Sequence, residues 1–153
     1  MDKRKVWIFD IDGTIADLGH RLHFINGKPK SWSRFFAACG EDAPIVPTLN
    51  MVRMILRDGF HDVILLSGRP EKCREDTVVW LTKQGIHADD YQMYMRPDNN
   101  TEPDTKIKWE IMEKLLAEGV EPIAIFEDRK CMVEMWREKG FFVLDVNQSG
   151  KDY

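Results

Sequence analysis

The feature that most constrains the fold is a regular alternation of short apolar runs with amphipathic segments along the chain. The runs, rich in β-branched and aromatic residues, are "KVWIFD" (5–10), "DVILLS" (62–67), "YQMYM" (91–95), "IAIFE" (123–127) and "FFVLD" (141–145). Such continuous hydrophobicity indicates strands that are covered on both faces, as in a parallel sheet.

The amphipathic segments between these runs predict helices, and each of them ends at a glycine. They cover residues 47–59, 71–85, 104–119 and 129–140, with Gly59, Gly85, Gly119 and Gly140 at their ends. Glycine is the residue that best tolerates the left-handed position after a helix. The order therefore predicts an α/β fold, a doubly wound (Rossmann-like), mostly parallel five-stranded sheet with helices on both faces and right-handed crossovers.

Residues 15–47 do not follow this alternation of strands and helices, because glycines and prolines recur through the segment. We expect a flap or small insertion with one short helix near "SWSRFFAAC", directly behind the first strand. It is too small for a second domain, so residues 1–153 are predicted to form a single domain.

Composition narrows the class of protein. The chain is 43% hydrophobic and 31% charged, as in soluble globular proteins, and no stretch approaches the roughly 18 apolar residues of a membrane span. The net charge of −4 gives no support to broad binding of nucleic acid, so a polyanionic partner needs a local basic patch. The three scattered cysteines favour a reducing, cytoplasmic location over a disulfide framework or a zinc site.

Polar and charged residues stand where the expected strands end. Asp10 and Asp12 follow the first run two positions apart, so their side chains point to the same side. The carboxyl ends of parallel strands form the ligand-binding edge of an open α/β sheet. The residues that we expect at this edge are Asp10, Asp12, Gly13, Thr14, Ser67, Gly68, Arg69, Asp104, Lys106, Lys108, Glu127, Asp128 and Arg129.

Each of these features has a plainer reading when it is taken alone: D-x-D-G as a turn, "SGR" as a helix cap and a lysine as a solvated side chain. Together they indicate phosphoryl transfer. Clustered carboxylates repel one another unless a cation is present, and oxygen ligands favour Mg²⁺. Ser67, a lysine and the Gly13 and Thr14 amides could hold the phosphoryl group while one carboxylate attacks and its neighbour protonates the leaving alkoxide.

This pattern resembles the haloacid dehalogenase (HAD) superfamily of phosphotransferases over the whole chain. Within that superfamily, "DIDGTIADLGHR", "LLSGR" and "FEDRKCMVEMWREKG" are similar to the 3′-phosphatase domain of bacteriophage polynucleotide kinase-phosphatase. The resemblance implies an Mg²⁺-dependent phosphoric monoester hydrolase that acts through an aspartyl-phosphate intermediate.

The resemblance also implies roles for single residues. Asp10 would be the nucleophile and a metal ligand, and Asp12 the general acid and base with its backbone carbonyl on Mg²⁺. The residues that would bind substrate or its phosphate are Gly13, Thr14, Arg21, Ser67, Gly68, Arg69, Asp104 and Lys108. Glu127 and Asp128 would complete the metal site, and the spacing from Asp104 favours Lys108 over the alternative Lys106.

The chain departs from the family pattern at two points. Glu127 stands where the family has an aspartate, and a longer acid could shift the metal without abolishing its binding. The sequence has no G-x-x-x-x-G-K-[ST] motif, so the kinase half of the phage enzyme is absent from it. We therefore expect a free-standing phosphatase or a relative with another substrate.

Three functions remain open at this point. Because neither insertion is large enough for a full cap domain, the resemblance implies an open site, which suits a 3′-phosphate on a nucleic acid end and a role in repair. A small-molecule phosphatase such as a 5′(3′)-nucleotidase, capped by a dimer partner, is the alternative, and a catalytically silent phosphate-binding module is the third. An oligomer is not specifically predicted.

The composition of the flap helps to distinguish these three functions, because basic and aromatic residues are interspersed in it. Trp32 could stack on a base, although aromatic residues at this spacing more often form a packed helix face. Arg96 is a candidate phosphate contact or a solvated loop residue. His20 and His23 flank Arg21, and we expect them to be surface or packing residues rather than metal ligands.

Overall fold

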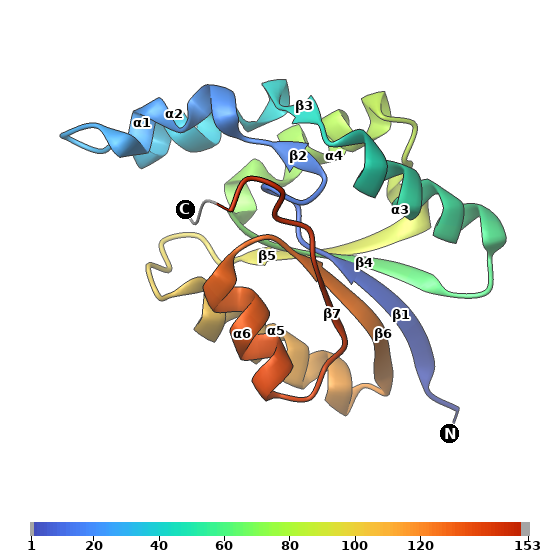
Figure 1. The fold of residues 1–153 in the computed structure, drawn as a ribbon. Coiled ribbons are helices and arrows are strands. Elements are labelled where there is room, and N and C mark those ends of the chain that lie inside the picture. Colours follow the sequence, from blue (N-terminus) through green and yellow to red (C-terminus); the bar gives the residue numbers. More distant parts are fainter. Residues whose placement is uncertain (1, 151–153) are drawn as a thin grey trace.

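The computed structural model describes residues 2–150, and its centre is a five-stranded parallel sheet (Figure 1). The strands are β1 (Arg4–Phe9), β4 (Asp62–Pro70), β5 (Tyr91–Arg96), β6 (Val120–Glu127) and β7 (Val143–Asp145). Their order is β5-β4-β1-β6-β7, and every neighbouring pair is parallel. The predicted strands and the doubly wound α/β class are confirmed, with β1 at the centre of the sheet.

Helices cover both faces of this sheet (Figure 1). They are α3 (Val46–Asp58) and α4 (Arg74–Lys83) on one face, and α5 (Asp104–Ala117) and α6 (Lys130–Glu138) on the other. A 3₁₀ turn, η3 (Glu71–Cys73), precedes α4, so the second predicted helix begins later than expected as an α-helix. The four glycines predicted to stop the helices all have positive φ, between 75° and 91°.

Alternation along the strands divides the core into two clusters. In β1, Phe9 packs toward α3 and α4, whereas Val6 and Ile8 pack toward α5 and α6. Since both faces of the central strand are buried, its sequence is almost continuously apolar. Asp10 follows at the end of this buried strand and is itself only 6% exposed.

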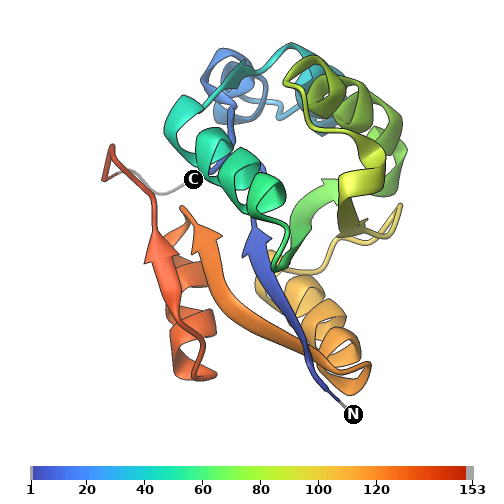
Figure 2. The ribbon, with the colours of Figure 1, turned by 90° about the vertical axis from the view of Figure 1, so that its right-hand side faces the viewer.

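The insertion after β1 is a flap whose base is a two-stranded antiparallel ribbon, β2 (Ala16–Asp17) with β3 (Ala43–Pro44). Figure 2 shows the flap beyond the arrowheads of the sheet strands, so it covers part of their carboxyl edge. The predicted short helix is α2 (Trp32–Ala37), and a second short helix, α1 (His23–Asn26), was not expected. The other short elements are η1 (Gly19–Arg21), η2 (Cys39–Glu41) and, before β5, η4 (Ala88–Asp90).

In the described part of the chain, no helix combines the length and the apolar character needed to cross a membrane.

Candidate active site

A tight loop after β1 places Asp10 and Asp12 at the edge of the sheet. The backbone amide of Asp10 donates to Phe126 O at 3.0 Å, which fixes it beside β6. The amides of residues 14–16 all donate to Ile11 O at 2.9–3.1 Å, so the chain turns sharply between the two aspartates and the flap. Asp10 is thereby held deep in the sheet edge, while Asp12 lies nearer to the flap.

Lys108 lies at the centre of the buried charges. Its Nζ donates to Asp10 Oδ1 at 2.8 Å and to Glu127 Oε2 at 3.0 Å, and Trp136 Nε1 also donates to Glu127 Oε2, at 3.3 Å. Burial would lower the pKa of Lys108, but the charges of Asp10 and Glu127 raise it above its usual value, so the ammonium stays protonated. Lys106 is exposed and pairs with Glu102 and Glu110, so only Lys108 can reach Asp10.

Asp10, Glu127 and Asp128 form a buried carboxylate cluster, with ligand oxygens all within 4.8 Å of one another. Among the described residues, no hydrogen-bond donor reaches Glu127 Oε1 or Asp128 Oδ2. Burial and the charge of Asp10 raise the pKa of Glu127 to about 8 and that of Asp128 to about 9. Three carboxylates around one ammonium, with unpartnered oxygens, fit a hard divalent cation such as Mg²⁺.

Asp12 is held by two arginines from different elements. Its Oδ1 accepts hydrogen bonds from Arg21 Nη2 at 2.6 Å and from Arg69 Nη2 and Nε at 2.7 and 3.1 Å. Burial would raise the pKa of Asp12, but Arg69 and Arg21 outweigh it and hold that pKa below its usual value. Both arginine side chains are fully buried. Their predicted contact with a substrate phosphate stays a prediction, since the structure places them on Asp12.

Asp42, near the end of the flap, forms ion pairs with both of these arginines. Its oxygens accept hydrogen bonds from Arg21 Nε and Nη2 at 2.8 and 2.7 Å and from Arg69 Nη2 at 3.0 Å, and His20 Nε2 lies 2.7 Å from Oδ1. The Asp42 side chain is completely buried. Sequence reasoning missed this residue, because "GEDAP" reads as an exposed turn and the burial arises only when the flap folds back.

The remaining loop residues shape the site by close approach. Thr14 Oγ1 donates to Asp128 Oδ1 at 3.3 Å, and Ser67 Oγ accepts from the amide of Arg69 at 3.1 Å. A Cβ on Gly13 would lie 2.0 Å from Asp128 Oδ2, so a larger residue there would have to displace that carboxylate. The structure thus brings Asp10, Asp12, Gly13, Thr14, Lys108 and Asp128 together, and it buries Ser67 beside them; their catalytic roles stay predictions.

Asp104 and Arg96 fix the loop between β5 and α5. Asp104 pairs with Arg96 and with Arg129, and a Cβ on Gly68 would come within 2.7 Å of Asp104 Oδ1. Arg96 also donates to the backbone oxygens of Gly68, Asn100 and Glu102 at 3.1, 3.1 and 2.5 Å. The structure therefore gives both residues a role in positioning this loop.

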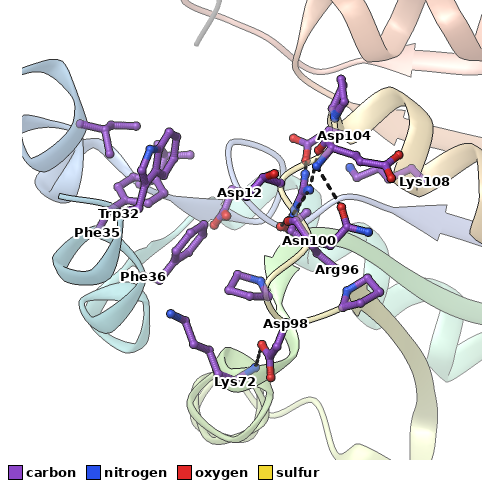
Figure 3. A pocket seen from close by; sticks show the side chains of 18 of the residues that line it. Asp12, Trp32, Phe35, Phe36, Lys72, Arg96, Asp98, Asn100, Asp104 and Lys108 are labelled. Atoms are coloured by element: carbon purple, nitrogen blue, oxygen red, sulfur yellow. Dashed lines mark hydrogen bonds and ion pairs between the residues drawn. The ribbon is translucent and has the colours of Figure 1, made fainter. Parts of the chain in front are cut away.

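An open cavity of about 610 Å³ lies above Asp10, Asp12 and Lys108. Figure 3 shows the aromatic residues of α2 on one side, the Arg96–Asp104 loop on the other, and Asp12 between them. A phosphate bound at the carboxylate edge could thus extend its organic group into a space with one apolar and one polar wall.

Comparison with known proteins agrees with this geometry. The family model for the polynucleotide kinase PNKP phosphatase domain, of the HAD type, matches residues 4–151. A protein of Autographa californica nuclear polyhedrosis virus, assigned as a bifunctional polynucleotide kinase/RNA ligase, is 26% identical over 129 residues; the match covers 84% of this chain and 17% of that protein.

Solved structures give the same result. A chain of the Pnkp1/Rnl/Hen1 RNA repair complex superposes with a TM-score of 0.76 at 28% identity, over 95% of this chain and 43% of that one. The class C acid phosphatase of Bacillus anthracis, with tungstate bound, has a TM-score of 0.68 at 12% identity, over 99% and 70%, and shares the fold. This chain spans less than half the length of the polynucleotide kinase/ligase relative and of the repair-complex chain.

Proposed function

The chain belongs to the family of HAD-type phosphatase domains found in polynucleotide kinase PNKP and is a phosphoric monoester hydrolase; from this premise we propose that it removes 3′-phosphate groups from nucleic acid ends. The observation that carries the proposal is the placement of Asp10. Its carboxylate lies 2.8 Å from the Lys108 ammonium, beside Glu127 and Asp128 and below an open cavity. A carboxylate so placed can attack phosphorus with its repulsion from the phosphate reduced.

In the first step, an oxygen of Asp10 forms a bond to phosphorus and the bond from phosphorus to the 3′-oxygen breaks. Asp12 donates a proton to that leaving oxygen, which departs as a hydroxyl, and an aspartyl-phosphate remains. Lys108 orients Asp10 and balances part of the negative charge.

In the second step, water attacks the phosphorus of the aspartyl-phosphate and gives a proton to Asp12, which releases phosphate and restores Asp10. The arginines that lower the pKa of Asp12 favour its carboxylate form, which suits this step. In the first step, the dianionic substrate brings negative charge next to Asp12 and raises its pKa, which favours the protonated form.

The carboxylates of Asp10, Glu127 and Asp128 and the backbone carbonyl of Asp12 would hold Mg²⁺, which neutralises charge on the transferring phosphoryl group when it is bound. The longer Glu127 reaches the cluster while still accepting from Lys108 and Trp136. The departure from the family's aspartate is therefore compatible with a metal site.

The substrate is argued from the openness of the cavity and from relatives in RNA repair. The test is phosphate release, with Mg²⁺, from 3′- and 5′-phosphorylated oligonucleotides and from nucleoside 3′- and 5′-monophosphates. We expect the 3′-phosphorylated oligonucleotide to have the highest kcat/KM, and Asp10→Asn to abolish its hydrolysis. Equal or better turnover of mononucleotides would favour a nucleotidase, and no release from any substrate would favour a silent binding module.

A further inference from the structure

One wall of the cavity is apolar and consists of side chains from the flap. Leu22, Ile25, Trp32, Phe35 and Phe36 line it, and Phe35 has only 6% of its surface exposed. Trp32 differs from Phe35, because 51% of its surface is exposed although it lies in the same short helix. The helix therefore buries one aromatic ring in the core and leaves the largest one at the cavity.

The Trp32 ring is supported on the protein side and is not a loose surface residue. It stacks on Phe36 with 5.9 Å between ring centroids and an interplanar angle of 24°, and it lies nearly perpendicular to the Phe35 ring, with 5.7 Å between centroids. Phe35 in turn lies under the guanidinium of Arg21, 4.4 Å from ring centroid to Cζ. The apolar wall is thus packed directly on the arginine that holds Asp12.

The wall across the cavity is polar and carries both acidic residues and cations. Lys72, in η3, is exposed and lines the cavity, and its backbone amide donates to Asp98 Oδ1 at 2.9 Å. In Figure 3 its side chain extends from η3 into the space below Phe36. Since Arg96 fixes the loop that carries Asp98, both walls are held in place before a ligand binds.

We propose that this cavity is a binding site for the last nucleotides of a single strand, an inference that rests on the proposed 3′-phosphatase function. The terminal base stacks on Trp32, and Lys72 binds the phosphodiester that precedes the terminal nucleoside.

The chemistry of the walls selects this ligand. Aromatic side chains stack on bases of any sequence, and an unpaired terminal base can turn onto such a ring without breaking a base pair. The chain as a whole carries a charge of −4, so a polyanion must be attracted by local cations. Lys72 on one wall, and Lys30, whose Nζ lies 6.0 Å from the Trp32 ring centroid, supply them.

The experiment compares kcat/KM for three substrates with terminal 3′-phosphates: a single-stranded oligonucleotide, the same strand with an abasic terminal nucleotide, and a nucleoside 3′-monophosphate. We expect Trp32→Ala to lower kcat/KM about tenfold or more for the normal oligonucleotide, and much less for the abasic one. Trp32→Phe retains an aromatic face and should restore most of the loss. Phe60→Ala removes an aromatic residue that is 81% exposed outside the cavity and is the matched control.

For Lys72→Ala we expect a loss on both oligonucleotides but not on the mononucleotide, which lacks the preceding phosphodiester. The slope of log kcat/KM against log salt concentration is negative, and it should become less steep by about 0.7, the value for one contact to a single strand. Lys83→Ala, at the far end of α4, should leave this slope unchanged.

Two results separate the inference from the function on which it rests. If the wild type fails to prefer the 3′-phosphorylated oligonucleotide, the proposed function is wrong. If the wild type shows that preference, but Trp32→Ala and Lys72→Ala, folded by their melting temperatures, keep wild-type kcat/KM and salt slope on it, the binding site proposed here is wrong while the function stands.

Discussion

Gly13 and Asp128 approach each other so closely that a Cβ on residue 13 would lie 2.0 Å from Asp128 Oδ2. Gly13 also has a φ of +79°, which costs an alanine about 1–2 kcal/mol. We expect Gly13→Ala to displace the Asp128 carboxylate and to abolish both phosphatase activity and stabilisation of the protein by Mg²⁺. The measurements are phosphate release and the melting temperature with and without MgCl₂.

Gly59→Ala is the matched control, because Gly59 has a φ of +75° but no atom within 4 Å of an added Cβ. It should lose similar stability and keep its activity and its response to Mg²⁺. If Gly13→Ala behaved as this control does, close packing against Asp128 would not matter to the site.

A second prediction concerns Asp42, the buried carboxylate shared by Arg21 and Arg69. Asp42→Asn leaves both arginine charges acting on Asp12, whose pKa is already low and should fall further. Less Asp12 is then protonated near neutral pH, so kcat should fall at least tenfold and the alkaline limb of the rate profile should move to lower pH. The loss of one partner from this buried ion-pair network should destabilise the protein by about 3–5 kcal/mol.

Asp62→Asn is the control for this change, since Asp62, at the start of β4, forms an exposed ion pair with Arg4 of β1. It should leave the rate profile unaltered. A folded Asp42→Asn protein with the wild-type kcat and pH profile would show that Asp42 does not position the arginines for catalysis.

The contrast between Asp10 and Asp42 explains what the sequence could predict. Asp10 follows an apolar run, and the end of a buried parallel strand is a defined place in an α/β sheet, so its position at the ligand edge was predictable. Lys108 was chosen by its spacing from Asp104, and the structure places it on Asp10. Asp42 gave no such signal, because its burial depends on contacts with Arg21 and Arg69, which are distant in sequence.

The aromatic residues of the flap also show which features could not be predicted from the sequence. The pattern of Trp32, Phe35 and Phe36 predicted a helix, and α2 is there. Helical spacing alone does not say which ring is buried. Phe35 is buried because it packs under Arg21, and Trp32 is exposed because the flap places it at the rim of the cavity. Such choices are made by tertiary packing.

A third prediction follows from the raised pKa values of Glu127 and Asp128, about 8 and about 9. These groups bind protons more tightly in the folded, metal-free protein than in the unfolded chain. Their contribution to the free energy of unfolding is therefore complete below about pH 4 and is lost as pH rises toward 8–9. Mg²⁺ binds the deprotonated carboxylates, so the rise in melting temperature caused by MgCl₂ should be larger at pH 9 than at pH 6.

Thermal unfolding with and without MgCl₂ at pH 6, 7, 8 and 9 measures this effect. Asp128→Asn removes one of the two groups and should reduce both the rise and its dependence on pH. An equal Mg²⁺ effect at all four pH values would contradict competition between protons and metal at this cluster.

The last prediction separates Lys108 from Lys106, two lysines on the same helix. Lys108→Met leaves Asp10 and Glu127 buried without the cation that pairs with them, which should abolish phosphatase activity and destabilise the metal-free protein by about 3–5 kcal/mol. Excess Mg²⁺ should recover part of the stability but not the activity, because the metal neutralises the cluster without orienting Asp10. Lys106→Met, on the exposed face, should leave both activity and melting temperature near wild type. The measurements are phosphate release and thermal unfolding of both variants. A Lys108→Met protein that still hydrolyses the 3′-phosphate at the wild-type rate would show that Lys108 has no part in the mechanism.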